Sequence, residues 1–205
     1  MNHKDFIKKY PELSAPQFYS AFGYYIFKNA IPTHFIHEVL NQHKTILAKS
    51  NKELMRSNGK KESHIFEGGL FVNPVIDIDK ELDTSLMSYY HVINYLLELP
   101  NLKNKLKKIC SAFQLSQTLV FEKSFYSLFS KEEGFSCYIP LVDTHNAFLY
   151  YGSHHEKKKK YEENKKIRAM LDTGDIIVLN GMLEAGIEDM QPYSPSIKCF
   201  YKDKQ

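Results

Sequence analysis

The first half of the chain carries apolar residues at the three- and four-residue spacing of amphipathic helices. The clearest case covers residues 31–50, where Thr33 stands in the N-cap position of a helix with one apolar stripe. Residues 84–113 follow the same spacing on both sides of Pro100, which predicts two helices joined near that proline. A β-branched and aromatic run at residues 23–31 predicts a short strand before the first of these helices. The stripe of that helix consists of Phe35, Ile36, Val39, Leu40, Ile46 and Leu47.

From about residue 117 the pattern changes to short strand-like runs separated by Gly, Asp, Asn and Pro. Runs of this length with turn residues between them are typical of a β-barrel or sandwich rather than of βαβ units. The pattern therefore predicts an α+β protein of one domain, residues 1–205, with a mainly helical part at 1–116 and a mainly β part at 117–205. The strand-like runs are residues 118–129, 135–143, 147–152, 167–171, 175–181 and 196–202.

Length and composition are those of a folded domain. Of the 205 residues, 43% are hydrophobic and 14% are aromatic, which excludes the charged, aromatic-poor composition of disordered chains. Much of the net charge of +3 lies in the lysine-rich segment 156–166 rather than along a helix face, so nucleic acid is not an expected partner. We expect Lys157–Lys160 to lie in a solvated loop, because closely spaced like charges repel unless a partner neutralises them.

Cysteine use and the length of the apolar runs bear on the compartment. Cys110, Cys137 and Cys199 are widely spaced without a CxxC pair, so neither a disulfide framework nor a zinc knuckle is predicted. Residues 1–13 lack the apolar core of a signal peptide, and no run of about 18 apolar residues occurs in the sequence. We therefore expect a cytoplasmic protein without membrane association.

Two adjacent histidines, His154 and His155, stand where an apolar run ends and the lysine-rich segment begins. Metal ligation, a turn and surface exposure are three readings of this pattern, and we favour a structural role. Gly152 is expected to take a positive φ or to allow a close backbone approach. Ser153 is expected to hydrogen-bond the local backbone, with the histidines opening an exposed loop. A solvated helix face is likewise expected for His34, His37 and His43.

Three stretches together resemble phytanoyl-CoA dioxygenase-like proteins. "YIPLVDTHNAFLYYGSHH" (138–155) resembles that family's strand, acidic turn, short strand and Gly-Ser-His turn, with Tyr151 in place of a proline. "LDTGDIIVLNGMLEAGIED" (171–189) resembles its Gly-Asp turn, apolar strand and small-residue turn. "GYYIFKNAIPTHFIHEVL" (23–40) resembles its N-terminal strand and helix, so the similarity extends in order over residues 17–202.

The resemblance implies a double-stranded β-helix, which is a jelly-roll or cupin-like fold, with N-terminal helices packed on one side. It also implies Fe(II) bound by two histidines and one carboxylate, and 2-oxoglutarate bound through a basic residue on a late strand. Such a facial triad leaves coordination positions open for the oxoacid and dioxygen. Loss of the ligands therefore removes the reaction.

The family's metal ligands have no counterpart at the matching positions. The interval 130–134 between two of the strand-like runs contains no His-x-Asp or His-x-Glu, and counting from Gly174 places Ala185 at the position of the distal histidine. The arginine that holds the oxoacid corresponds to Lys198, which keeps the charge without the planar guanidinium. We therefore predict a protein that lacks the usual iron triad, needs no cofactor, and binds or converts a small metabolite without iron-dependent oxidation. The candidate lining residues are Tyr126, Asn180, Lys198 and Tyr201.

Two alternative functions stay open at this point. Asp143 and His145 lie two residues apart, and with His154 they are candidate Fe(II) ligands of an active 2-oxoglutarate-dependent dioxygenase with a non-standard ligand set. The same "DTHN" segment also fits a turn, which we favour. The other alternative is a protein interaction module whose Lys157–Lys166 loop contacts an acidic surface. The oligomeric state stays open as well.

Overall fold

The computed structural model of the chain describes residues 1–48, 65–66, 69–72, 84–121, 134–155, 162–187 and 195–203. The helices in these ranges are α1 (His3–Ile7), α2 (Ala15–Phe22), α3 (Thr33–Ala48), α5 (Thr84–Glu98), α6 (Pro100–Lys107) and the short 3₁₀ turns η1 (Ser153–His155) and η2 (Glu163–Lys165). None of these helices is long and apolar enough to cross a membrane. The strands are β1 (Tyr24–Phe27), β2 (Ile65–Phe66), β3 (Gly69–Val72), β4 (Phe113–Phe121), β5 (Phe135–Pro140), β6 (Thr144–Tyr150), β7 (Lys166–Leu171), β8 (Ile176–Asn180), β9 (Ala185–Ile187) and β10 (Ser196–Asp203).

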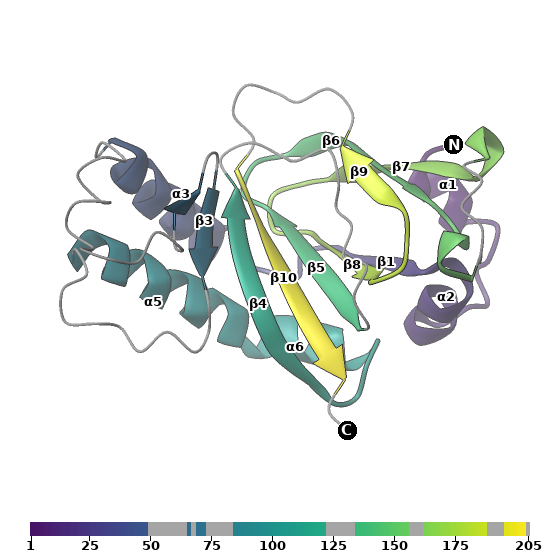
Figure 1. Cartoon of the computed structure of the whole chain (residues 1–205). Coiled ribbons are helices and arrows are strands. Elements are labelled where there is room, and N and C mark those ends of the chain that lie inside the picture. Colours follow the sequence, from purple (N-terminus) through teal and green to yellow (C-terminus); the bar gives the residue numbers. More distant parts are fainter. Residues whose placement is uncertain are drawn as a thin grey trace.

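Two antiparallel sheets form the β part of the molecule (Figure 1). The larger sheet has the order β1-β8-β5-β10-β4-β3-β2, and the smaller has the order β7-β6-β9. Neighbours in the larger sheet, such as β5 and β10, are far apart in the sequence because the chain passes back and forth between the sheets. This crossing pattern is that of a jelly roll. The predicted α+β class is therefore confirmed.

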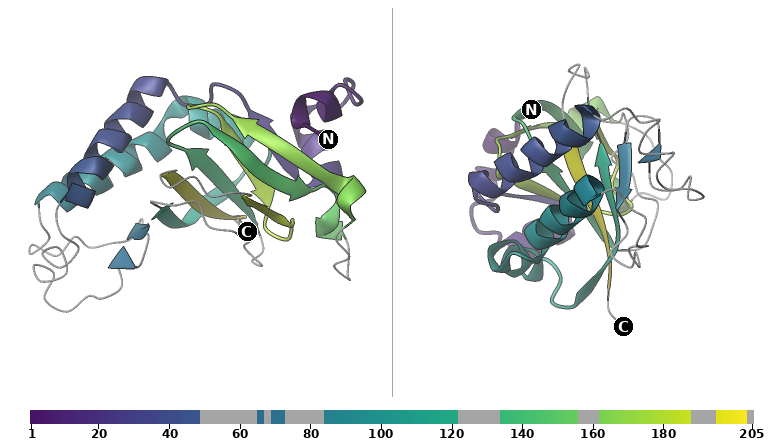
Figure 2. Two further views of the ribbon diagram at one scale, coloured as in Figure 1. Left: turned by 90° about the horizontal axis from the view of Figure 1, so that it is seen from above. Right: turned by 90° about the vertical axis from the view of Figure 1, so that its left-hand side faces the viewer.

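The helices α3, α5 and α6 cover one face of the larger sheet (Figure 2). Ile36 and Val39 of α3 and Ile93 of α5 are fully buried in the same core as Ile139 and Ile197 of the sheet. Burial of one such side chain stabilises the fold by about 1.5–3 kcal/mol. The apolar stripe predicted from the sequence is thus what attaches these helices to the sheet, and the predicted break at residue 100 is the start of α6.

The histidines of α3 divide between solvent and core. His34 and His37 are exposed, as predicted. His43 is buried, and its Nδ1 lies 2.8 Å from the hydroxyl oxygen of Tyr89. The expectation for His43 was wrong because position 43 lies four residues after Val39 and therefore on the core side of the helix. Burial lowers the pKa of His43 to about 4, so its imidazole is neutral at pH 7.

A second apolar core fills the space between the two sheets. Tyr138 and Ile177 of the larger sheet share this core with Leu149 of the smaller one. Since side chains alternate along a strand, β5 and β8 supply one set of residues to this core and the other set to the core under the helices. The helices α1 and α2 lie beside the smaller sheet (Figure 1), where Phe6 and Phe18 are buried in the same core.

Several local features differ from the sequence predictions. β4 begins at Phe113, so the division placed between residues 116 and 117 falls inside a strand. β6 begins at Thr144, so Asp143 belongs to the preceding turn while the residues after it are in the strand. β9 has no counterpart among the predicted runs, because three residues are too few to show alternation. Gly152 follows the prediction and has a φ of +76°.

Candidate functional site

Lys198 lies on β10, on the face that points between the two sheets. Directly paired residues of antiparallel strands share a face, and Lys198 pairs with Tyr138, which belongs to the core between the sheets. Its chain neighbours Ile197 and Cys199 belong to the core under the helices. The lysine side chain is therefore directed into the interior, and the residue is only 3% exposed.

The surroundings of Lys198 combine an aromatic ring with a hydroxyl group. Its Nζ lies 4.7 Å from the ring centre of Phe200, which follows two residues later on the same face. Ser196, two residues earlier on that face, is fully buried, and its Oγ has no hydrogen-bond partner among the described residues. Burial lowers the pKa of Lys198 to about 7, because an apolar interior disfavours the charged form. The site therefore combines a buried amine, whose pKa is lowered, with a hydroxyl group that has no hydrogen-bond partner among the described residues.

Of the four residues predicted to line a pocket, Lys198 is the one that the described structure places between the sheets. Asn180 ends β8, where its Oδ1 accepts a hydrogen bond from the backbone nitrogen of Met182 at 2.9 Å and closes the following turn. Tyr201 lies in the core under the helices, on the other face of the larger sheet. Tyr126 lies outside the described residues.

Tyr201 lines a different space, a hollow of about 320 Å³ on the helix side of the larger sheet. The sheet itself separates this hollow from Lys198, since the two residues face opposite cores. The hollow lies between the end of α5, the beginning of α6 and the strands β4 and β10. Its other lining residues are Leu97, Glu98, Lys103, Phe113, Gln114 and Leu115.

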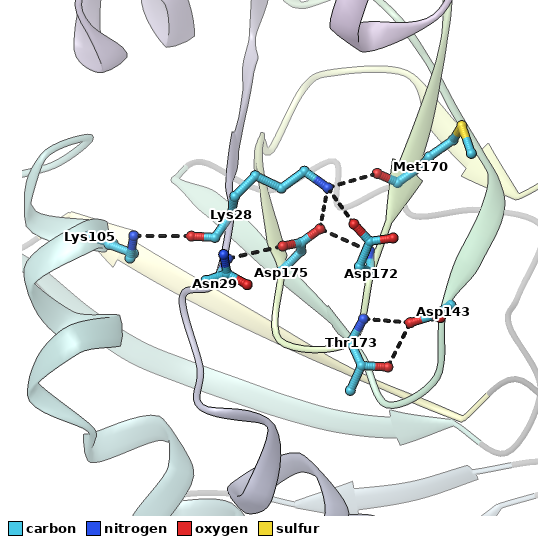
Figure 3. A network of polar contacts seen from close by, with 8 residues as sticks. All are labelled: Lys28, Asn29, Lys105, Asp143, Met170, Asp172, Thr173 and Asp175. Atoms are coloured by element: carbon cyan, nitrogen blue, oxygen red, sulfur yellow. Dashed lines mark hydrogen bonds and ion pairs between the residues drawn. The ribbon is translucent and has the colours of Figure 1, made fainter.

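Asp143 and His154, two of the alternative iron ligands, lie beyond opposite ends of one strand. β6 separates them, and its seven residues at about 3.3 Å each correspond to about 23 Å. Asp143 is also engaged elsewhere, because its Oδ1 accepts hydrogen bonds from N and Oγ1 of Thr173 at 2.7 and 2.8 Å (Figure 3). The third residue, His145, is in β6, and its side chain lies outside the described part of the chain. The structure does not bring Asp143 and His154 together.

His154 and His155 attach the segment after β6 to helix α2. The Nε2 atom of each histidine lies 3.2 Å from the carbonyl oxygen of Ser20. Ser153 Oγ accepts a hydrogen bond from the backbone nitrogen of Glu184 at 2.9 Å, which joins this segment to the start of β9 rather than to the local backbone as expected. Partial burial lowers the pKa of His154. These contacts hold both histidines against α2.

A buried carboxylate joins three chain segments at the ends of β1 and β7 and the start of β8 (Figure 3). Asp175 is 1% exposed, and its Oδ1 accepts a hydrogen bond from the backbone nitrogen of Asn29 at 3.0 Å. Its Oδ2 accepts hydrogen bonds from the backbone nitrogen of Asp172 at 2.9 Å and from Lys28 Nζ at 2.5 Å. Partial burial acts to lower the pKa of Lys28, but hydrogen bonds to the two aspartates raise it above its ordinary value. The Gly-Asp turn is visible in the sequence, whereas nothing there indicates Lys28 as its partner.

The residues at the positions matched to the iron ligands do not fit the usual triad. Within the described ranges, no group of three or more His, Cys, Asp or Glu side chains could hold a metal ion. Ala185, matched to the distal histidine, is buried between the sheets and has no ligating atom. Residues 130–133 of the matched His-x-Asp interval lie outside the described residues, and the sequence of the interval 130–134 contains no histidine.

Solved structures provide the comparison with known proteins. The epimerase SnoN in complex with Fe3+, alpha ketoglutarate and nogalamycin RO aligns with a TM-score of 0.63 over 92% of this chain and 82% of that one, at 14% identity. EctD from S. alaskensis with 2-oxoglutarate and 5-hydroxyectoine aligns with a TM-score of 0.64 over 93% and 76%, at 13% identity. HygX from Streptomyces hygroscopicus with nickel and 2-oxoglutarate aligns with a TM-score of 0.57 over 91% and 85%, at 11% identity. No family model and no curated protein sequence matches the chain.

The likeness establishes the fold. The chain has the double-stranded β-helix fold of 2-oxoglutarate-dependent oxygenases, as the sequence resemblance implies. The expectation that no cofactor is needed is contradicted, because structures with this fold hold Fe3+ with alpha ketoglutarate or nickel with 2-oxoglutarate. That expectation equated missing metal ligands with a missing cofactor. Lys198, the basic residue matched to the position that holds the oxoacid, is buried between the sheets.

Proposed function

We propose that the chain is a phytanoyl-CoA dioxygenase-like protein that lacks the usual iron triad and binds a small 2-oxoacid, such as 2-oxoglutarate, between its two sheets. The observation that carries this proposal is the buried Lys198 with the buried Ser196 hydroxyl on the interior face of β10. Solved structures with the same fold include complexes with alpha ketoglutarate and with 2-oxoglutarate, which supports an oxoacid as the ligand.

An anionic ligand suits this site for an electrostatic reason. Removing an ammonium group from water costs several kcal/mol, and the lowered pKa of Lys198 has this burial as its cause. A carboxylate next to Nζ offsets that cost and favours the charged form of the amine. Ser196 Oγ adds a hydrogen bond that contributes about 1 kcal/mol. Ligand and protonated lysine therefore stabilise each other in the interior.

Isothermal titration calorimetry with 2-oxoglutarate tests the proposal. Lys198→Met removes the charge and keeps most of the side-chain length, and we expect a loss of affinity of about tenfold or more, equivalent to about 1.4 kcal/mol. Ser196→Ala is expected to weaken binding by about 1 kcal/mol. Lys103→Met is the matched control, because Lys103 lies on α6 outside the space between the sheets, and it should leave the affinity unchanged. Equal affinity of Lys198→Met and the unaltered protein contradicts the proposal.

Iron-dependent oxidation is the competing function, since the solved neighbours include an iron complex. Protein incubated anaerobically with Fe(II) and freed of excess metal is analysed for bound iron and for succinate formed from 2-oxoglutarate. Stoichiometric iron with succinate formation, both abolished in His145→Ala, would establish the oxygenase with non-standard ligands. Binding of 2-oxoglutarate without succinate formation supports the proposal made above.

A further inference from the structure

Three electron-pair donors meet where the segment after β6 contacts the end of helix α2. Nε2 of His154 and Nε2 of His155 each lie 3.2 Å from the carbonyl oxygen of Ser20. The two imidazole rings are also close to each other, with their ring centres 3.8 Å apart. Metal ligation is one of the readings that the sequence leaves open for these adjacent histidines, and the structure adds a third donor atom that the sequence does not indicate.

The separation of these atoms fits the coordination shell of a small divalent cation. Zinc binds histidine nitrogen at about 2.0–2.1 Å and oxygen at about 2.0–2.2 Å. Two ligand atoms at about 2.1 Å from one metal are about 3.0 Å apart at the right angle of an octahedron and about 3.4 Å apart at the tetrahedral angle. The distance of 3.2 Å from each imidazole nitrogen to the carbonyl oxygen lies between these values. A cation bound to all three atoms therefore requires only small movements of the side chains.

The end of α2 favours positive charge at this position. Ser20 lies in the last turn of the helix (Ala15–Phe22), where carbonyl groups lack an intrahelical donor and the helix dipole places partial negative charge. Without a metal, the Nε2–H groups of the two imidazoles supply the partial positive charge that this oxygen attracts. A cation bound to both Nε2 atoms supplies a full charge instead, while each neutral imidazole carries its proton on Nδ1.

Contacts outside the imidazole rings hold the histidine segment beside α2. The backbone nitrogen of Gly152 donates a hydrogen bond to the carbonyl oxygen of Phe22 at 3.0 Å. Ser153 Oγ accepts a hydrogen bond from the backbone nitrogen of Glu184 at 2.9 Å. The donors are therefore brought together before any metal binds. Two of the three belong to exposed residues, so a cation reaches them from solvent and water completes its coordination.

We propose that Nε2 of His154, Nε2 of His155 and the carbonyl oxygen of Ser20 bind a divalent cation of the zinc type. Imidazole nitrogen suits Zn2+, Cu2+ and Ni2+, whereas Mg2+ and Ca2+ take oxygen ligands. The set contains two side chains and one backbone oxygen, so it differs from the groups of three side chains that the described ranges lack. A bound cation links the segment after β6 to α2 and stabilises the folded chain by mass action. The inference is independent of the proposed function, because none of these donors belongs to β10.

Isothermal titration calorimetry with zinc chloride, on protein first freed of metal by a chelator, tests this site. In His154→Gln and His155→Gln the glutamine NH2 group replaces Nε2–H, which preserves a hydrogen-bond donor to Ser20 but removes a zinc ligand. We expect each variant to bind zinc about tenfold more weakly or worse. His37→Gln is the matched control, because His37 is an exposed histidine of another helix, and it should leave the affinity unchanged. Magnesium chloride should give no binding heat.

Nitrogen-15 NMR of the histidine side chains locates the metal. Saturating zinc should shift the Nε2 resonances of His154 and His155 together, along with the carbonyl carbon-13 resonance of Ser20. Circular dichroism checks that each variant is folded, and the exposed His155 provides the deciding variant if His154→Gln does not fold. Equal zinc affinity of His155→Gln and the unaltered protein overturns the inference. Zinc-induced shifts at other histidines but not at these two overturn it as well.

Discussion

Replacement of Asp175 by asparagine perturbs the buried crossing of chain segments shown in Figure 3. The carboxylate serves as an acceptor for two backbone N–H groups, those of Asn29 and Asp172, and for the ammonium group of Lys28. Asparagine keeps the size of the side chain but offers one acceptor oxygen and one NH2 group. The variant therefore tests hydrogen bonding and charge with little change in packing.

The magnitude of the effect follows from these contacts. In either orientation of the asparagine amide, its NH2 group faces the backbone N–H of Asn29 or that of Asp172, and a buried donor without an acceptor costs about 1–3 kcal/mol. The hydrogen bond from Lys28 also changes from charged to neutral, a further loss of about 1 kcal/mol. The Lys28 side chain is 41% exposed and can turn to water, which limits the energy lost from its changed hydrogen bond. We expect Asp175→Asn to lower the free energy of unfolding by about 3 kcal/mol.

Urea denaturation followed by far-ultraviolet circular dichroism at pH 7 measures the difference in free energy of unfolding between Asp175→Asn and the unaltered protein. In a chain of this size, a loss of about 3 kcal/mol corresponds to a decrease in Tm of about 6–12 °C. Asp172→Asn is the matched control, because that carboxylate also contacts Lys28, at 3.1 Å, but its side chain is 65% exposed. The control should cost less than about 1 kcal/mol.

Two results would refute this reasoning. One is a change below about 0.5 kcal/mol for Asp175→Asn, which is the usual range for surface substitutions. The other is an equal change for both aspartate variants, since burial would then be irrelevant. A double-mutant cycle with Lys28→Met separates the lysine from the backbone contacts, and its coupling energy with Asp175 should be about 1 kcal/mol.

Three other measurements test the physical account. Gly174→Ala should lower the free energy of unfolding in urea by about 2 kcal/mol or more, because φ is +96° and the added Cβ would lie 2.6 Å from the carbonyl oxygen of Ile31; an unchanged value contradicts the geometry. His3 and His43 have a pKa lowered from 6.5 to about 4, so the unfolded chain binds more protons below pH 6.5 and the free energy of unfolding should fall between pH 6.5 and 4, by up to about 3 kcal/mol for each histidine. A flatter pH dependence is expected for His43→Gln. Calorimetric affinity for glutarate should weaken as the pH rises through about 7, because the Lys198 pKa is lowered to that value and the neutral amine does not hold a carboxylate.

Local signals explain how much of the fold could be predicted. The period of Ile36 and Val39, the break at Pro100 and the alternation along β7 each act within a few residues, and the structure has the corresponding elements. The strand β9 was missed because its three residues carry no period. The helical spacing that buries Ile36 and Val39 also places His43 on the buried side of the helix. The prediction nevertheless put His43 on the solvated face, because histidine is a polar residue.

The candidate site could be predicted only in part. The resemblance of the late strand to that of the family indicated Lys198. A lysine has the same charge as the family's arginine but lacks its planar guanidinium group. The contribution of Ser196 was missed, because a serine next to a proline reads as a turn residue and its burial depends on neighbouring strands. Asn180 and Tyr201 were predicted to line a pocket together with Lys198, yet Asn180 closes a turn and Tyr201 faces the helices.

The sequence by itself determined that alternate residues of β10 occupy two different faces, because the side chains of any strand alternate. It did not determine which face lies between the sheets. Both faces of β10 are buried, so hydrophobicity does not distinguish them, and the faces are told apart only by α3, α5 and α6 packing on the side of Ile197 and Cys199. That packing, formed by residues far away in the chain, directs Lys198 into the interior and gives its amine a low pKa.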